Sequence, residues 1–360
     1  MSNLISKLGL CLLANGLLIA CGSPGVPLPP SLELARPVSD FKATRKGDRV
    51  YLAWSVPSET TDGHNIKHPG SVDICRNVGS PVHECATPVA KLSVQKSAEP
   101  RTTVAAKRQA TYSDQLAAKL QYENPTADLF YAVRVLNSYA RSAGLSNQRQ
   151  VPAAPTLPPP SLFRALVTAE GVQCNWTAVA LIDVSGLRFV YRIYRREQGS
   201  SKDSVVGELP ATNDAITFTD RSIEWEKSYE YRITVVTFIA RGGSEQQVEG
   251  DDSNPVTVVA HDVFPPAAPS GLQAVFSGPG QKPFIDLVWT PDTEADLAGY
   301  NVYRHKPGTQ ALKLNSELVR SPAFRDTEIQ SGEEYLYSVS AVDTRGNESE
   351  RSPEAAETVP

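Results

Sequence analysis

The sequence predicts an all-β protein made of three tandem antiparallel β-sandwiches, and two observations carry this prediction. The first is the alternation of apolar and polar residues in short segments rich in β-branched and aromatic residues, which is typical of strands with one buried face. The second is that these segments recur three times in the same order along 360 residues. Long helical periodicity is scarce, so a helical fold is not supported.

Each of the three copies contains the same succession of segments. A Pro-rich run is followed by a strand that ends on Trp, a strand that ends on Arg, an aromatic–x–Asp site and a closing strand. The Trp strands are 50–54, 172–176 and 285–289, the Arg strands are 72–76, 191–195 and 300–304, and the closing strands are 130–136, 229–236 and 335–342. This pattern predicts that each copy packs two sheets face to face across one core.

The three copies resemble fibronectin type III domains, whose fold is immunoglobulin-like. In that family a core tryptophan lies on the second strand, and a corner tyrosine bonds its hydroxyl to nearby backbone. The resemblance therefore assigns structural core roles to Trp54, Trp176, Trp289, Tyr229 and Tyr335. The first copy departs from the family, because Leu129 stands at the corner position, fifteen residues after Asp114 rather than nine. We therefore expect the first domain to be divergent, with longer loops.

The Pro-rich runs mark the expected domain limits, because proline fixes φ and favours extended, semi-rigid spacers. The expected divisions are a signal peptide (1–20), a lipidated flexible tether (21–36), domain 1 (37–150), a linker (151–160), domain 2 (161–260), a linker (261–269) and domain 3 (270–360).

The N-terminus predicts export. Lys7 is the only charge among the first twenty residues, and a short apolar stretch follows it. The residues at 18–21, Leu-Ile-Ala-Cys, resemble the bacterial lipoprotein signal, which implies a lipid on Cys21 and a stable anchor in the membrane. Gly22 stands where an inner-membrane retention signal would have Asp, which favours the outer membrane. A simple signal peptide with an incidental cysteine is the alternative.

The remaining cysteines fit an oxidising compartment. Cys75 and Cys85 are ten residues apart with turn residues between them, which suits a disulfide that closes a short loop. Two unpaired thiols are the alternative. Cys174 shares one strand face with Val172 and Trp176, so we expect it to be a buried, inert thiol.

No pattern in the sequence indicates an active site, a cofactor or a metal. His64 and His68 lie in a Gly/Pro-bounded loop and are expected to be solvated. Asp292, Glu294 and Asp296 alternate like the start of an EF-hand, but the required glycine and glutamate are missing, so a solvated acidic loop is expected.

Trp225 is the one tryptophan outside the repeated strands and is a candidate binding residue. An exposed tryptophan here would stack on a sugar or anchor a protein partner. The alternative is that it caps its own domain or packs in the joint between domains.

These observations favour a non-catalytic, lipid-anchored protein of the bacterial cell envelope that presents its domains for protein–protein interaction or scaffolding. A glycan-binding or adhesive surface lipoprotein is the alternative. An enzyme would need its chemistry in the extra residues of the first domain, at 57–70 and 91–128, where no paired carboxylates have a partner. The net charge of −5 speaks against nucleic acid, which requires a basic face.

Overall fold

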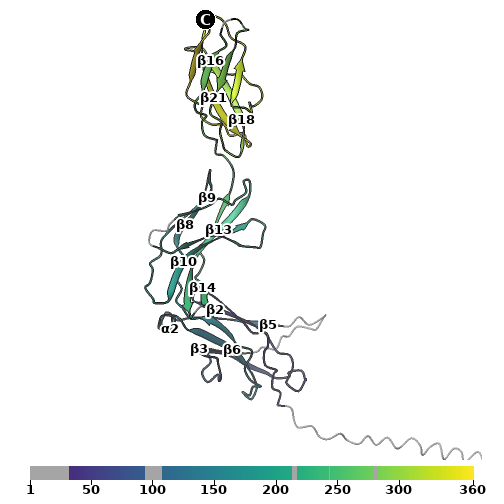
Figure 1. Ribbon diagram of the computed structural model, residues 1–360. Helices are drawn as coiled ribbons and strands as arrows, with labels where there is room; N and C mark the ends of the chain where they lie inside the picture. The colour runs from purple at the N-terminus through teal and green to yellow at the C-terminus, as the bar shows by residue number, and fades with distance from the viewer. Residues whose placement is uncertain (1–31, 94–107, 213–216, 243, 279, 281) are drawn as a thin grey trace, which may run out of the picture. The chain divides into compact units, whose positions relative to one another are not determined.

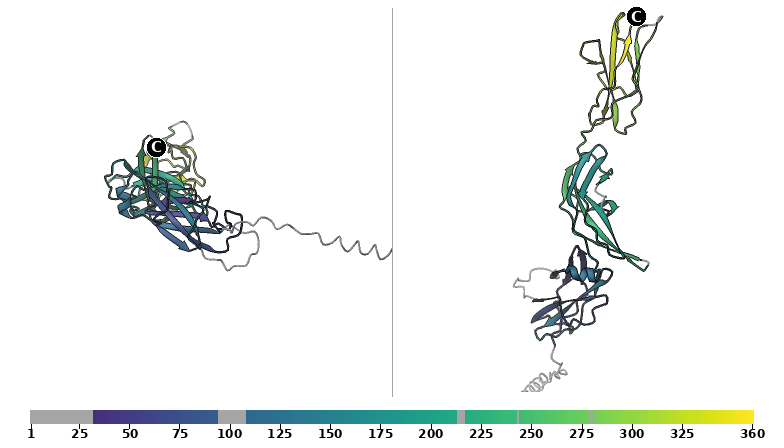
Figure 2. Two further views of the ribbon diagram at one scale, coloured as in Figure 1. Left: turned by 90° about the horizontal axis from the view of Figure 1, so that it is seen from below. Right: turned by 90° about the vertical axis from the view of Figure 1, so that its left-hand side faces the viewer.

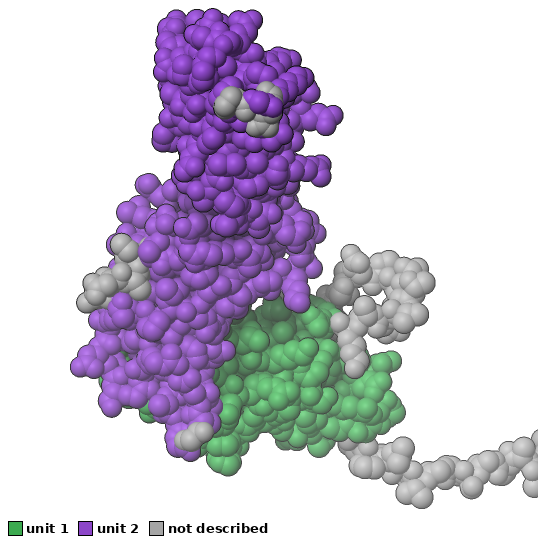
Figure 3. All heavy atoms as spheres, turned by 45° about the horizontal axis from the view of Figure 1, so that its top comes forward, with its two compact units in different colours: residues 1–154 green, residues 155–360 purple. Residues whose placement is uncertain are grey.

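The computed structural model describes residues 32–93, 108–212, 217–242, 244–278, 280 and 282–360. These residues are almost entirely β, with antiparallel pairing throughout and one short helix (Figure 1). The predicted all-β fold class is therefore confirmed. The chain divides into two compact units, residues 1–154 and 155–360, which Figure 3 colours separately.

Unit 1 contains two sheets that enclose one core. One sheet has the order β1-β2-β5 and the other β4-β3-β6-β7. The elements are β1 (Lys42–Lys46), β2 (Arg49–Ser55), β3 (Pro69–Val78), β4 (Ala90–Ser93), β5 (Gln109–Gln115), α2 (Ala118–Glu123), β6 (Asp128–Asn137) and β7 (Arg149–Pro152).

The alternation in β2 shows why this sequence forms a half-buried strand. Val50, Leu52 and Trp54 are buried, whereas Arg49 and Tyr51 face solvent. The buried set packs against the inward side chains of the opposite sheet, so both sheets contribute to a single core.

Unit 2 contains four sheets in two groups, which are joined by one stretch of chain (Figure 2). The first group pairs β12-β9-β8 with β11-β10-β13-β14, and β15 also pairs with β13. Its strands are β8 (Ser161–Thr168), β9 (Gly171–Thr177), β10 (Leu187–Glu197), β11 (Ser204–Pro210), β12 (Thr217–Asp220), β13 (Ser228–Arg241), β14 (Ser244–Glu249) and β15 (Val256–Val259).

The second group of unit 2 repeats this arrangement with shorter strands. It pairs β16-β17-β20 with β19-β18-β21-β22. Its strands are β16 (Gln273–Phe276), β17 (Ile285–Val288), β18 (Leu297–His305), β19 (Leu312–Lys313), β20 (Ala323–Asp326), β21 (Glu334–Asp343) and β22 (Ala355–Thr358). Each group of strands has its own core, so unit 2 contains two separate β-sandwiches.

The end of the expected tether at 21–36 contacts the first sandwich. Ala35 is buried in the core of unit 1 and forms a bridge with Thr60, and the amide of Thr61 donates to the carbonyl of Leu34. Because the side chain at 35 is apolar, it can be buried, and the chain joins the sandwich at an earlier residue than the proline content of this segment suggests. Residues 1–31, with the expected signal and Cys21, lie outside the described residues.

The expected linker at 151–160 contains residues that are buried in the cores of the sandwiches. Val151 lies on β7, and Val151 and Ala153 are buried in the core of unit 1. Leu157 is buried in the first core of unit 2, and the hydroxyl of Thr237 donates to the carbonyl of Pro155 at 3.0 Å. The prolines set extended backbone here, but the apolar residues between them fill the cores.

The described residues contain no helix long and apolar enough to cross a membrane.

Candidate functional site

The candidate site of unit 1 is built on the segment 138–145, which follows β6 and is called the 138–145 loop below. Asn137 ends β6 and is 6% exposed. Its Oδ1 accepts hydrogen bonds from the amides of Tyr139 and Arg141, each at 2.9 Å. Its Nδ2 donates to the carbonyl of Leu32 at 2.8 Å. One buried amide therefore fixes both the loop and the segment that enters the sandwich.

This fixed loop projects polar and aromatic groups into solvent. The side chain of Tyr139 is 80% exposed, which is the highest value among the large hydrophobic residues that the structure describes. It borders a surface hollow of about 640 Å³ lined by Leu32, Glu33, His68, Asn137, Tyr139 and Arg141. His68 Nδ1 lies 3.1 Å from the carboxylate of Glu33. Within the described residues, the guanidinium of Arg141 has no ion-pair partner, so it is available to a ligand.

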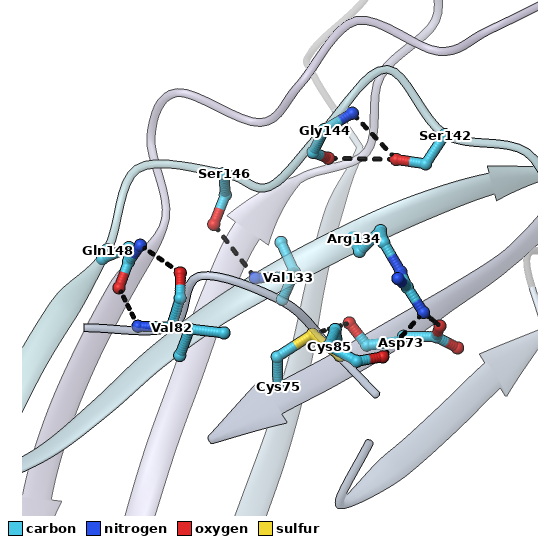
Figure 4. Close-up of a disulfide and its surroundings, with 10 residues drawn as sticks. All are labelled: Asp73, Cys75, Val82, Cys85, Val133, Arg134, Ser142, Gly144, Ser146 and Gln148. Carbon is cyan, nitrogen blue, oxygen red and sulfur yellow. Dashed lines mark hydrogen bonds and ion pairs between the residues drawn. A yellow bond between two sulfur atoms is a disulfide. The ribbon is translucent and has the colours of Figure 1, made fainter. Parts of the chain in front are cut away.

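The other side of the 138–145 loop is stiffened by the disulfide between Cys75 and Cys85, whose Cα atoms are 5.4 Å apart (Figure 4). The bond that the cysteine spacing predicts is therefore present. Arg134 on β6 points at this bridge and donates to the carboxylate of Asp73 at 2.8 Å and to the carbonyl of Cys85 at 2.9 Å. The disulfide segment is thus tied to the strand that leads into the loop.

A second set of bonds anchors the disulfide segment on its far side. The side-chain amide of Gln148 both donates to and accepts from the backbone of Val82, each at 2.8 Å (Figure 4). Val82 is buried with Cys75, Cys85 and Ala132 in a small apolar cluster. Because both flanks of the loop are held, its binding groups lose little freedom when a ligand binds.

Each sandwich also contains a buried Arg–Asp–Tyr cluster, which the sequence pattern suggested only in part. The clusters are Arg76–Asp114–Tyr131, Arg195–Asp220–Tyr231 and Arg304–Asp326–Tyr337. In all three, one carboxylate oxygen accepts from the guanidinium at 2.7–2.8 Å and from the tyrosine hydroxyl at 2.6–2.9 Å. The arginine and aspartate recur visibly in the sequence, but their pairing across two sheets does not.

Burial, and then the neighbouring carboxylate, raise the pKa of the cluster tyrosines above the ordinary value. These hydroxyls therefore stay protonated and donate to the aspartate. The clusters are buried and hydrogen-bonded, and each joins the two sheets of its sandwich.

The residues assigned to the core lie as follows. Trp54, Trp176 and Trp289 are all buried, and within the described residues their indole Nε1 atoms have no hydrogen-bond partner. The hydroxyl of Tyr229 accepts from the amide of Glu224 at 2.9 Å, and that of Tyr335 accepts from the amide of Gln330 at 3.0 Å. Leu129, at the corner position of the first copy, is buried in the core of unit 1.

Trp225, the candidate binding residue, is partly buried. Its ring is partly buried against the first core of unit 2 and contacts Phe264, with centroids 6.1 Å apart. This contact is of the kind that the alternative interpretation, packing in the joint, expects, and a binding role for the exposed part of the ring stays a prediction. Cys174 is completely buried, and this burial raises the pKa of its thiol to about 12, so the thiol stays protonated. Sequence reasoning missed Tyr139, whose only signal is an aromatic residue inside the polar turn Asn-Ser-Tyr-Ala-Arg.

No protein-family model matches the chain. Among curated proteins, the amylopullulanase of Thermoanaerobacterium saccharolyticum is 32% identical over 139 residues, which are 39% of this chain and 10% of the enzyme. The amylopullulanase of Thermoanaerobacterium thermosulfurigenes is 29% identical over 150 residues, which are 42% of this chain and 7% of the enzyme. The chain therefore spans only a small part of these enzymes.

Two solved structures are also similar. An Fn3-like protein from Clostridium thermocellum is 33% identical, with 27% of this chain and 96% of that chain covered and a TM-score of 0.23. The FN1–FN3 domains of chicken CNTN1 are 15% identical, with 90% of this chain and 99% of that chain covered and a TM-score of 0.25. In this chain, each sandwich pairs two antiparallel sheets around its own core. The chain is thus built from β-sandwiches of the fibronectin type III and immunoglobulin-like fold.

Proposed function

We propose that the chain is an exported, lipid-anchored, non-catalytic protein of the bacterial cell envelope. In this proposal its three fibronectin type III domains, at 37–150, 161–260 and 270–360, present a surface that binds another envelope protein. Three separate cores support the three-domain division. The disulfide in unit 1 supports export, because such bonds persist in oxidising compartments.

The observation that carries the binding role is the 138–145 loop with its exposed Tyr139. Tyrosine and arginine are enriched among the residues that dominate protein–protein binding energy, because a rigid ring and a forked donor give large, specific contacts. Tyr139 and Arg141 leave the same fixed turn, and a hollow of about 640 Å³ lies beside them. A partner that fills this hollow would cover the tyrosine ring and pair with the guanidinium.

Affinity capture with paired variants tests the binding role. The purified protein is used to capture partners from detergent-solubilised envelope, and free protein is added as competitor. We expect one protein to be recovered specifically. The Tyr139→Ser variant should recover at least about tenfold less of that protein, which corresponds to a loss of about 1.4 kcal/mol or more of binding free energy. Tyr122→Ser is the matched control, because Tyr122 is a 51% exposed tyrosine elsewhere in unit 1. Equal recovery with both variants would show that the loop is not the binding site.

The anchor is tested separately through Cys21. We expect the wild type to fractionate with membranes and Cys21→Ser to appear in the soluble fraction, because several acyl chains are needed for stable anchoring. Density separation of inner and outer membranes then tests the outer membrane, which Gly22 favours. If Cys21→Ser fractionates like the wild type, the lipid-anchor proposal is wrong.

A glycan is the second candidate ligand, and the similarity to amylopullulanases favours it. Tyr139 would then stack on a sugar ring, while Arg141 and Glu33 would bond its hydroxyls. Native gel electrophoresis in the presence of pullulan tests this candidate directly. If pullulan retards the wild type and Tyr122→Ser but not Tyr139→Ser, the ligand of the 138–145 loop is a polysaccharide rather than a protein.

A further inference from the structure

Charge is distributed unequally between the two units of the chain. Residues 37–150, in unit 1, contain 15 Lys and Arg against 10 Asp and Glu, which is a net charge of +5. Unit 2, at 155–360, contains 18 Lys and Arg against 29 Asp and Glu, which is a net charge of −11. Such an asymmetry favours contact between the basic part of a chain and an anionic surface. An anionic surface would attract unit 1 and repel unit 2.

The basic character of unit 1 is concentrated on the outward side of the sheet β1-β2-β5, which is called the basic face below. Arg49 and Tyr51 of β2 point outward, because the residues that alternate with them face the core. Residues directly opposite each other in an antiparallel pair lie on the same side of the sheet. The outward residues of β1 and β2 are therefore Lys42 opposite Ala53, Thr44 opposite Tyr51 and Lys46 opposite Arg49. The outward residues of β5 are uncharged, so these three strands present three cations and no carboxylate on this side.

Two cations of the basic face are available to an external anion. Lys42 is exposed, and its side chain forms no ion pair with the residues that the structure describes. The side chain of Arg49 is 53% exposed, and its Nε lies 3.9 Å from the carboxylate of Asp48, in the turn between β1 and β2. An exposed pair at this distance is weak. The Asp48 carboxylate also accepts a hydrogen bond from Gln115 Nε2 at 3.2 Å, so Arg49 is not its sole partner.

Tyr51 lies at the centre of the basic face, between Thr44 on β1 and Ser113 on β5. Its side chain is 48% exposed, although no core packing holds it on this side of the sheet. A tyrosine suits the boundary between water and lipid, because its ring is apolar and its hydroxyl stays hydrated. Lysine and arginine side chains suit the same boundary, since an apolar stem carries each charge.

The corresponding sheets of unit 2 do not have this character. On the outward side of β12-β9-β8, Arg164 is the one cation among the described strand residues, and the exposed Leu166 lies next to it on the same strand face. On the outward side of β16-β17-β20, Arg325 is bound to Asp286 by two hydrogen bonds of 2.7 and 2.8 Å. The basic face is therefore a property of the first sandwich and not of the fold.

We propose that the basic face of unit 1 binds the anionic headgroups of a phospholipid membrane. The chain from Cys21 to Leu32 spans at most about 40 Å even when fully extended. A lipid on Cys21 therefore keeps unit 1 near the headgroups, where a high effective concentration makes a weak contact sufficient. The choice of a membrane rests on the lipid anchor of the proposed function, whereas the affinity of the basic face for anionic lipid is measured without that anchor.

Vesicle co-sedimentation tests the basic face with the chain from Gly22 to Pro360, which carries neither the expected signal nor a lipid. Phosphatidylcholine vesicles that contain about one third phosphatidylglycerol are compared with pure phosphatidylcholine, and we expect binding to the anionic vesicles alone. The double variant Lys42→Glu, Arg49→Glu should bind at least about 25-fold more weakly, because each cation near an anionic surface strengthens binding about fivefold. The double variant Lys202→Glu, Lys282→Glu is the control. It changes the net charge equally at exposed lysines of unit 2 and should bind nearly as the wild type.

Salt dependence gives a second readout. Binding of the wild type to anionic vesicles should fall steeply between about 0.05 and 0.5 M NaCl, because salt screens exposed charges. Both double variants should keep the circular dichroism spectrum and the Tm of the wild type, since the replaced side chains are exposed. The proposal is wrong if the wild type does not sediment with anionic vesicles at low salt, or if the two double variants bind equally. It is also wrong if the chain binds soluble dextran sulfate but not the vesicles, because the ligand is then a polyanion rather than a membrane.

Failure of the basic face and failure of the lipid anchor are distinguishable. The vesicle experiment uses a chain without Cys21, so its result does not depend on lipidation. The fractionation of Cys21→Ser is read after the membranes are washed at high salt, which screens the basic face and leaves a lipid anchor intact.

Discussion

Replacing both Cys75 and Cys85 by alanine should destabilise unit 1 and leave unit 2 unchanged. The bridge closes a loop at a sequence separation of 10, and the chain-entropy relation gives about 2.7 kcal/mol for a loop of this length. Both sulfur atoms are also buried in the small cluster with Val82 and Ala132, so their loss removes packing and adds to this value. A loss of this size is a large part of the 5–15 kcal/mol that typically stabilises a domain.

Urea titration followed by hydrogen exchange and mass spectrometry measures this loss locally. Peptides from β3 and β6 report on unit 1, and peptides from β10 report on unit 2 as an internal control. The midpoint for β3 and β6 should fall, and Tm should fall by about 10 °C at about 4 °C per kcal/mol. Reduction of the wild type with dithiothreitol should produce most of the same shift without any change in sequence.

Two results would refute this reasoning. If the double alanine variant loses less than about 1 kcal/mol, the chain-entropy account fails and the Gln148–Val82 bonds hold the segment without the bridge. If the β10 peptides lose protection equally, the disulfide does not act on unit 1 alone.

The remaining predictions concern buried groups of unit 2. Tyr231→Phe removes a hydroxyl that donates to the Asp220 carboxylate at 2.9 Å, so the free energy of unfolding measured by urea titration should fall by about 1.5–3 kcal/mol; an unchanged midpoint would contradict this. Cys174 should not react with a thiol reagent in the native protein at pH 9, because burial raises its pKa to about 12, and it should react once urea unfolds the chain. Since the folded state holds the Cys174 proton more tightly, the free energy of unfolding should fall as the pH rises through the ordinary thiol range towards 12. Rapid labelling of the native protein would show that Cys174 is not a buried, protonated thiol. Trp176→Ala should cost about 3–5 kcal/mol, whereas the partly buried Trp225→Ala should cost clearly less in the same titration.

The β-sandwich fold is readable from the sequence because its determinants are local. Alternation in β2, β9 and β17 fixes which side chains face inward. A buried tryptophan stands at the C-terminal end of this strand in each copy: Trp54 and Trp176 are one residue before the ends of β2 and β9, and Trp289 directly follows β17. Domain limits are less predictable. Proline content predicts a semi-rigid spacer at 151–160, but it does not predict that Val151 is buried in the core of unit 1 and Leu157 in the first core of unit 2, because the packing around these residues decides their burial.

The candidate sites depend on contacts that no local pattern contains. Tyr139 becomes a binding candidate only because Asn137 fixes its turn and leaves the ring exposed. An EF-hand takes its ligands from one contiguous loop, and the loop that contains Asp296 lacks the required glycine and glutamate, so this pattern does not predict a site there.

The side chain of Asn137 has a mechanical consequence. A pull on the chain before Leu32 is carried into the sandwich through the bond from Asn137 Nδ2 to the Leu32 carbonyl. The same amide holds the turn that carries Tyr139 and Arg141, through its Oδ1. Tension at the N-terminal end would therefore reach the turn through Asn137, in addition to the bonds of Leu34 and Ala35 with the residues at 60–61. The position of the exposed Tyr139 ring is thus coupled to the position of Leu32 through one side chain.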